Sequence, residues 1–177
     1  IAQIHEIAPI LAIMIHNLMR PPEIVEDFIT QDVVSYMDAH FRTLPDRESR
    51  GISGHSMGGK GAFTIAMKHP ELFSVLYSHS AGILDFESAF LGDRKEHLIT
   101  ASQLKKFTMA DFFIYPLEVA SCFACAPAYA PNPEAPPVYG DFPVTAEGEI
   151  IADTWQRWLQ HDPYTMVADY VANLKQI

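Results

Sequence analysis

One serine in this chain lies where nucleophilic chemistry could occur. The run Gly54-His55-Ser56-Met57-Gly58 has the spacing Gly-x-Ser-x-Gly, which presents a serine hydroxyl on a sharp turn between a strand and a helix. The backbone N–H of Met57, at the start of that helix, points to where the negative oxygen of an attacked acyl group would form. The pattern therefore predicts Ser56 as a nucleophile and Met57 as an oxyanion donor.

This stretch is also compatible with two other interpretations. A glycine-rich turn could simply pack a helix onto a sheet. Residues 54–60 also fit Gly-x-x-x-x-Gly-Lys, the pattern of a phosphate-binding loop, but Gly61 stands where that loop needs a Ser or Thr to hold magnesium. The sequence therefore favours the nucleophile over nucleotide binding.

The residues around this serine predict a strand, a helix and a second strand. Residues 50–53 give a short strand signal, and 62–67 place apolar groups on one side of a helix that Pro70 stops. Residues 72–78 read as the next strand, which ends at His79. Ser56 and His79 thus fall at carboxyl ends of strands, where parallel sheets bind ligands.

The preceding residues extend this alternation. Residues 10–16 form an apolar run of the length of a buried strand, although the run is also compatible with a short helix. Apolar residues then recur at helical spacing over 23–41. Alternating strands and helices predict an α/β fold with a mainly parallel sheet and flanking helices.

The pattern is looser after Gly82. Helices are expected around 85–91 and 101–107, and 127–143 holds too many prolines for an interior helix or strand. This proline-rich stretch is expected to be an ordered segment that covers the sheet. A helical face at 150–159, with Trp155 and Trp158 in the core, and a last helix after Asp162 complete the chain.

Length and composition predict one globular domain. The chain has 177 residues, 49% of them hydrophobic, and a formal net charge of −10. Without a Lys/Arg cluster, nucleic acid and anionic membrane surfaces are poor partners, and a small neutral or cationic substrate fits better. No membrane span or signal peptide is apparent. The given sequence begins with Ile1 rather than Met, so it could lack a leader or an upstream segment. The cellular location is therefore not predicted.

Cys122 and Cys125 form a Cys-x-x-Cys pair. A redox or half-metal site is conceivable, but zinc needs two further ligands, and no second pair of cysteines or histidines lies nearby. Two small buried thiols are the favoured interpretation. We expect neither a metal nor an organic cofactor.

Several stretches resemble a known family. They are the run 41–59, which ends Arg-Gly-Ile-Ser-Gly-His-Ser-Met-Gly-Gly, then Lys-His-Pro-Glu-Leu-Phe at 68–73, Ser-Ala-Gly at 80–82, and 132–163 with its closing Trp-Leu-Gln-His-Asp-Pro. They resemble the esterase D-like esterases of the α/β-hydrolases, relatives of S-formylglutathione hydrolases, feruloyl esterases and antigen 85 mycolyltransferases. The resemblance implies that Ser56 accepts the acyl group.

The same resemblance implies that residues 1–177 are one α/β-hydrolase-type domain that is incomplete at both ends, with 83–150 as an insertion or covering segment. In the family, the second oxyanion donor precedes these residues, and the catalytic acid and histidine follow them. By resemblance the chain is a fragment that holds the nucleophile without its partners.

Substitutes for those partners could lie within the chain. His79 ends the strand beside the serine turn and is the best candidate base, and Asp85 could orient it. His55, Tyr139 and Phe142 are candidate substrate-lining residues. Each has a plain structural alternative as a packing, loop or surface residue.

The sequence and the resemblance together predict a serine esterase that hydrolyses a small carboxylic ester through an acyl-enzyme on Ser56. Two alternatives stay open: a non-catalytic binding or structural unit without a complete triad, and an acyltransferase that uses an alcohol as acceptor. A homo-oligomer that completes the site is a further expectation.

Overall fold

The computed structural model describes residues 22–177, which fall into two compact units. The first, here called the sheet unit, consists of Glu26–Ala89 and Gln160–Ile177. The second, the helical unit, includes Phe90–Leu159. The strand expected at 10–16 lies outside the described residues.

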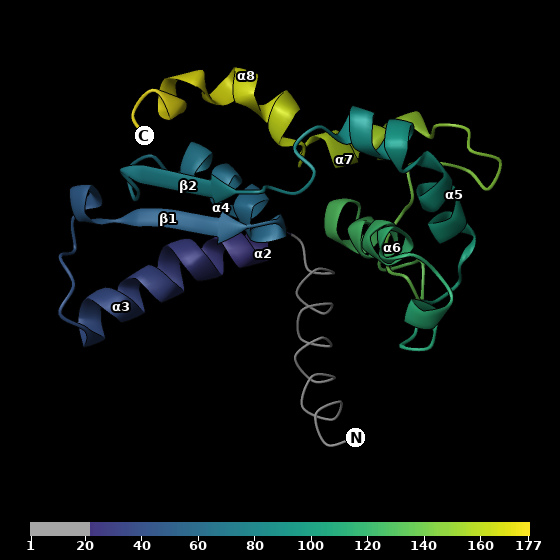
Figure 1. Cartoon of the computed structure of the whole chain (residues 1–177), viewed down its shortest axis with the longest axis horizontal. Helices are drawn as coiled ribbons and strands as arrows, with labels where there is room; N and C mark the ends of the chain where they lie inside the picture. Colours follow the sequence, from purple (N-terminus) through teal and green to yellow (C-terminus); the bar gives the residue numbers. More distant parts are fainter. Residues whose placement is uncertain (1–21) are drawn as a thin grey trace. The chain divides into compact units, whose positions relative to one another are not determined.

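The sheet unit is built on a β-α-β arrangement (Figure 1). Strands β1 (Gly51–His55) and β2 (Val75–His79) pair in parallel, from Gly51 opposite Val75 to His55 opposite His79, and α4 (Met57–Lys68) connects them. The predicted strand, turn, helix and parallel strand are confirmed. The second strand was placed too early, because the Leu72 N–H donates to the His69 carbonyl at 3.1 Å and closes a turn before β2 begins.

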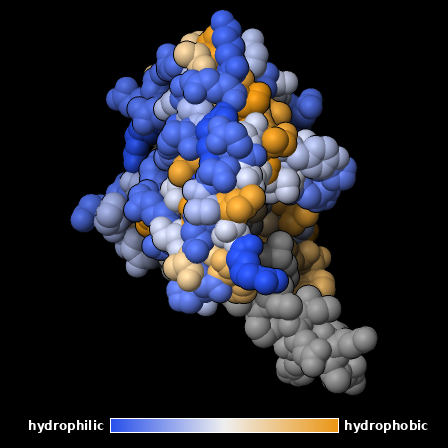
Figure 2. All heavy atoms as spheres, turned by 90° about the vertical axis from the view of Figure 1, so that its left-hand side faces the viewer, coloured by the Kyte–Doolittle hydropathy of each residue, from blue (hydrophilic) through white to orange (hydrophobic). Residues whose placement is uncertain are grey.

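The two faces of this sheet have different environments. Helix α4 packs against both strands through buried residues that include Ala62, Ile65 and Met67. The opposite face carries Val75 and Tyr77, which are 60% and 63% exposed. Exposed hydrophobic residues occur elsewhere too, and Figure 2 shows orange patches interrupting the hydrophilic surface on one side of the molecule.

The helix predicted over 23–41 is confirmed as three consecutive helical segments. They are α2 (Pro22–Asp27), the π-helical η1 (Phe28–Val33) and α3 (Val34–His40). Its apolar side is incompletely covered, since Phe28 and Tyr36 are 56% and 57% exposed. The short 3-10 helix η2 (Arg47–Ser49) then leads into β1.

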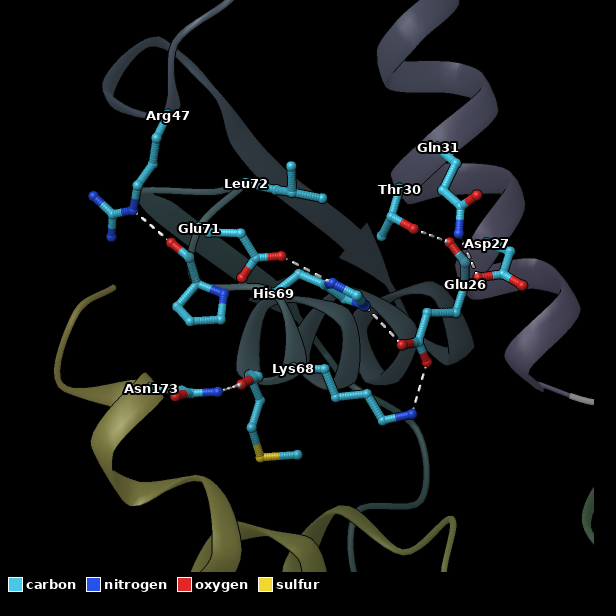
Figure 3. A network of polar contacts seen from close by, with 12 residues as sticks. Glu26, Asp27, Thr30, Gln31, Arg47, Lys68, His69, Glu71, Leu72 and Asn173 are labelled. Carbon is cyan, nitrogen blue, oxygen red and sulfur yellow. Dashed lines mark hydrogen bonds and ion pairs between the residues drawn. The ribbon is translucent and has the colours of Figure 1, made fainter.

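A polar network joins the start of this helix to the end of α4 (Figure 3). The Glu26 carboxylate accepts from Lys68 Nζ and lies against His69 Nε2, each at 2.7 Å. His69 Nδ1 lies 3.2 Å from a Glu71 carboxylate oxygen. One carboxylate thus fixes two consecutive residues at the carboxyl end of α4.

Helix α8 (Pro163–Leu174) confirms the last predicted helix and packs on α4. Asp162, 1% exposed, caps it by accepting from the Thr165 N–H, with proline in the first turn. The same carboxylate accepts from the Phe86 N–H at 3.2 Å. Asp162 therefore ties the segment after β2 to the start of α8.

The helical unit holds an aromatic core. Its elements are η3 (Glu87–Asp93), which begins in the sheet unit, α5 (Lys95–Gln103), η4 (Asp111–Phe113), α6 (Leu117–Tyr129) and α7 (Ala152–Leu159). Trp158 is fully buried, with the rings of Phe90 and Tyr129 edge-on at 5.1 and 5.4 Å. Trp155 is 8% exposed, so both tryptophans belong to the core, as predicted.

Three expectations for this region need correction. Helix α6 was not predicted, and it contains Pro127, which the sequence interpretation kept out of any helix. The helix expected to reach 107 ends at Gln103. The helix expected at 85–91 lies at Glu87–Asp93 and is π-helical, with a kink at Gly92.

The proline-rich chain beyond α6 is held by specific contacts. Pro131 bridges to Gly140, and Asn132 Nδ2 donates to Asp141 at 2.7 Å. Arg157 binds the other oxygen of Asp141 and also donates to the Pro131 carbonyl. These contacts anchor the stretch to α7 within the helical unit.

No helix among residues 22–177 is long and apolar enough to cross a bilayer.

Candidate active site

Ser56 sits at the turn between β1 and α4 in a rare backbone conformation. Its φ is 54° and its ψ −119°, and a positive φ is uncommon for a residue with a side chain. Although Ser56 precedes α4, its hydroxyl makes no capping hydrogen bond to that helix, and the residue is exposed. Ser56 is therefore an exposed residue whose hydroxyl is not used to cap α4, and its role as a nucleophile stays a prediction.

Close packing at two glycines makes this turn possible. A Cβ at Gly54 would lie 2.0 Å from the Gly58 carbonyl oxygen, and one at Gly59 would lie 3.0 Å from the His79 carbonyl oxygen. A Cβ at Gly58 would meet nothing within 4 Å. The turn thus requires glycine at the first position of the pattern and at Gly59, but has room for a side chain at Gly58.

Backbone hydrogen bonds from three directions hold Ser56. Its N–H donates to the His79 carbonyl at 3.0 Å, and its carbonyl accepts from the Gly82 N–H at 2.8 Å and the Lys60 N–H at 3.2 Å. The end of β2 and the first turn of α4 therefore fix the serine backbone together. Such bonds can offset the strain of a positive φ, which is about 1–3 kcal/mol.

The expected oxyanion donor is placed by the same turn. Met57 is the first residue of α4, and N–H groups of a first helical turn have no carbonyl partner within the helix. A Cβ at Gly82 would lie 3.6 Å from the Met57 nitrogen. Gly82, from the Ser-Ala-Gly stretch noted in the sequence, therefore lies beside that N–H, and a Cβ there would make ordinary van der Waals contact with it.

The two histidines expected near the serine are neighbours on the sheet. His55 and His79 pair in register, and their ring centres are 5.1 Å apart. Tyr77 stacks beside His79, with ring centres 6.0 Å apart and planes 20° apart. The hydrogen bonds of the described residues include none between either imidazole and the Ser56 hydroxyl.

Asp85 has a local role in the structure. Its carboxylate accepts from the Ser88 N–H at 3.1 Å, and its carbonyl accepts from the Ala89 N–H at 3.2 Å. It therefore caps the start of η3. Its role in orienting His79 stays a prediction.

Tyr139 and Phe142 lie in the helical unit. Tyr139 has a φ of 56° and is 54% exposed, and the Phe142 ring is 6.0 Å from that of Phe123. Phe142 has a packing partner there, whereas the Tyr139 side chain faces solvent. Their contact with a substrate stays a prediction.

A cavity of about 590 Å³ in the sheet unit lies away from Ser56. It is lined by the helix over 29–38 and by residues 49–53 of β1 and its approach. Within residues 22–177, no three His, Cys, Asp or Glu side chains are grouped to hold a metal ion. The chemistry available at the turn is therefore that of a serine hydroxyl, a helix N-terminus and two imidazoles.

Comparisons with known proteins relate this chain to a family of esterases. A model of the family described as "Putative esterase" matches residues 20–177. An S-formylglutathione hydrolase of Paracoccus denitrificans (strain Pd 1222) is 44% identical over an alignment of 64 residues. That alignment covers 31% of this chain and 23% of the length of that relative.

Proposed function

The chain belongs to this esterase family, and on that premise we propose that it hydrolyses a carboxylic ester of a small molecule through an acyl-enzyme on Ser56. The observation that carries the proposal is the strained, exposed serine between β1 and α4, whose hydroxyl caps nothing. A rare φ maintained by three backbone hydrogen bonds is typical of a functional position. Part of an α/β-hydrolase fold is the architecture that this turn implies.

The proposed reaction follows from the groups at the turn. Ser56 Oγ attacks the ester carbonyl carbon and gives its proton to an imidazole, while the carbonyl oxygen takes the negative charge beside the Met57 N–H. Collapse of this intermediate expels the alcohol, which takes the proton from the imidazole. Water then attacks the acyl-serine with the same base and releases the acid.

His79 is the proposed base among the described residues. Its backbone carbonyl accepts from the Ser56 N–H, so the two residues are fixed next to each other at the end of the sheet. General base catalysis contributes about 10²–10⁴-fold. Replacing His79 by Gln should lower kcat by that range, whereas His40→Gln, at the end of α3, should leave it nearly unchanged. A wild-type kcat in His79→Gln would remove His79 from the mechanism.

Hydrolysis of a chromogenic aryl acetate tests the proposed activity. Ser56→Ala should lower kcat/KM by about 10⁴-fold or more, because the covalent path is lost. Ser80→Ala is the matched control, since Ser80 is also exposed, follows a strand and has a positive φ of 44°. Full activity in Ser56→Ala, with wild-type circular dichroism, would contradict the proposal.

A second candidate is a non-catalytic unit, favoured by the lack of a hydrogen bond between the Ser56 hydroxyl and either imidazole. In that case the wild-type protein would fold, bind ester analogues and turn none of them over. The aryl acetate assay separates the two candidates, because only the first predicts a difference between wild type and Ser56→Ala.

A further inference from the structure

His55 and His79 form a cross-strand pair on the open face of the sheet. They are the last residues of β1 and β2 and pair directly in the parallel ladder. Both residues are exposed, and their ring centres are 5.1 Å apart with planes 52° apart. The side chains of strand partners project from the same face, so both imidazoles face the same space.

This spacing matches the geometry of two imidazoles on one metal ion. Zinc binds imidazole nitrogen at about 2.0–2.1 Å with tetrahedral angles. Two imidazole rings bound to one such ion therefore have their centres roughly 5 Å apart. We propose that His55 and His79 together bind a divalent first-row transition-metal ion, Zn²⁺ or Cu²⁺, and that water completes its coordination.

The surroundings favour a bidentate site at this position. Both strand ends are fixed, because the Ser56 N–H donates to the His79 carbonyl and the strands pair up to these residues. The Tyr77 ring stacks beside His79 and limits its motion. The chain's net charge of −10 adds a general attraction for cations. Two ligands fixed in this way lose little freedom when the ion binds.

Metal binding at this pair needs no ester and no reaction at Ser56, so it goes beyond the function proposed above. A consequence does rest on the proposed function. If His79 is the base for Ser56, an ion bound to its imidazole removes that base, and ester hydrolysis should fall over the same concentration range in which the ion binds.

Calorimetric titration of the chelator-treated full chain with ZnCl₂ tests the binding. We expect one saturable site, and His55→Gln or His79→Gln should each weaken it by roughly 10²-fold, because the second ligand of a linked pair acts at high effective concentration. His40→Gln is the matched control: His40 is also exposed, but its ring stacks on Tyr36 and its Nδ1 lies 2.9 Å from the Tyr36 carbonyl. MgCl₂ should give no heat of binding at this site.

Electron paramagnetic resonance with Cu²⁺ gives a second readout. Coupling to two equivalent nitrogens is expected in the wild type and to one in either single variant. Wild-type zinc affinity in both His→Gln variants, or no saturable site in the folded wild type, would overturn the proposal. Zinc binding without loss of ester hydrolysis would support the site and remove His79 as the base.

Discussion

At the scale of single residues, the turn at Ser56 depends on glycines at particular positions. The sequence pattern names two glycines, Gly54 and Gly58, but the structure gives them different roles. A Cβ at Gly54 would collide with the Gly58 carbonyl, whereas a Cβ at Gly58 would point into open space. The steric requirement behind the pattern therefore lies at Gly54 and, outside the pattern, at Gly59.

Alanine substitutions at the two glycines should consequently differ. Gly54→Ala forces a contact of 2.0 Å with backbone and should destabilise the fold by about 1–3 kcal/mol or more. Gly58→Ala lies in the first turn of α4 and should be neutral or stabilising by up to about 1 kcal/mol, because alanine favours helix. Urea unfolding measures both, and equal losses would contradict the packing described here.

Cys122 illustrates how burial controls reactivity. Burial, with a smaller contribution from the nearby Cys125 thiol, raises the pKa of Cys122 to about 12. Thiolates are the species that react with alkylating agents. This agrees with the expectation of a small buried thiol for Cys122, whereas Cys125 is only partly buried.

Iodoacetamide at mildly alkaline pH should therefore modify Cys122 in the folded protein far more slowly than in urea. Peptide mapping by mass spectrometry separates it from Cys125 in the same sample. Equal rates at Cys122 in the folded and unfolded protein would show that this thiol is accessible.

At the scale of elements, Glu26 connects α2 to the end of α4 (Figure 3). Burial alone would raise the pKa of the Glu26 carboxyl, but hydrogen bonds from Lys68 and His69, and their charges, outweigh it and hold the pKa below its ordinary value of 4.5. A carboxyl with a lowered folded-state pKa contributes stability above its unfolded pKa. This contribution is lost as the pH falls below 4.5 and through the folded-state pKa.

Glu26→Gln should accordingly lower the free energy of unfolding by about 1–2 kcal/mol at neutral pH. The difference from wild type should shrink in acid, where the wild-type carboxyl is itself protonated. Asp27→Asn is the control, because Asp27 accepts an exposed hydrogen bond from Gln31, and the substitution should change stability by about 0.5 kcal/mol or less. A pH-independent difference for Glu26→Gln would rule out the electrostatic explanation.

The elements that the sequence predicted best are those with clear end signals. Helix α4 lies between the serine turn and Pro70, and α8 begins with Asp162 and Pro163, so both could be placed from residue types alone. Helix α6 was missed because its alanines and cysteines give little periodicity and Pro127 argues against a helix. A proline in the last turn removes only one hydrogen bond, and this helix ends two residues later at Tyr129.

Other features of the site depend on pairing that sequence alone does not reveal. The ring contact between His55 and His79 follows from the register of the parallel pair, which places these two residues directly opposite each other. The steric role of Gly59 comes from a close approach between α4 and the end of β2. The residue types at the turn could be predicted, but their tertiary contacts could not.

At the scale of the whole molecule, the chain consists of a sheet unit that carries the serine turn and a helical unit with its own tryptophan core. The sequence predicted one domain with an inserted or covering segment at 83–150, and the helical unit includes Phe90–Leu159. That this segment covers the substrate stays a prediction. Family membership covers both units, because the family match extends over 20–177.

Labelling with a fluorophosphonate tests the central claim most directly, because this reagent forms a stable bond with a serine hydroxyl that a base activates. We expect a single modified peptide that contains Ser56, is absent in Ser56→Ala and is retained in Ser80→Ala. A folded wild-type chain that stays unlabelled, or that is labelled at another residue, would contradict the assignment of Ser56 as an activated nucleophile.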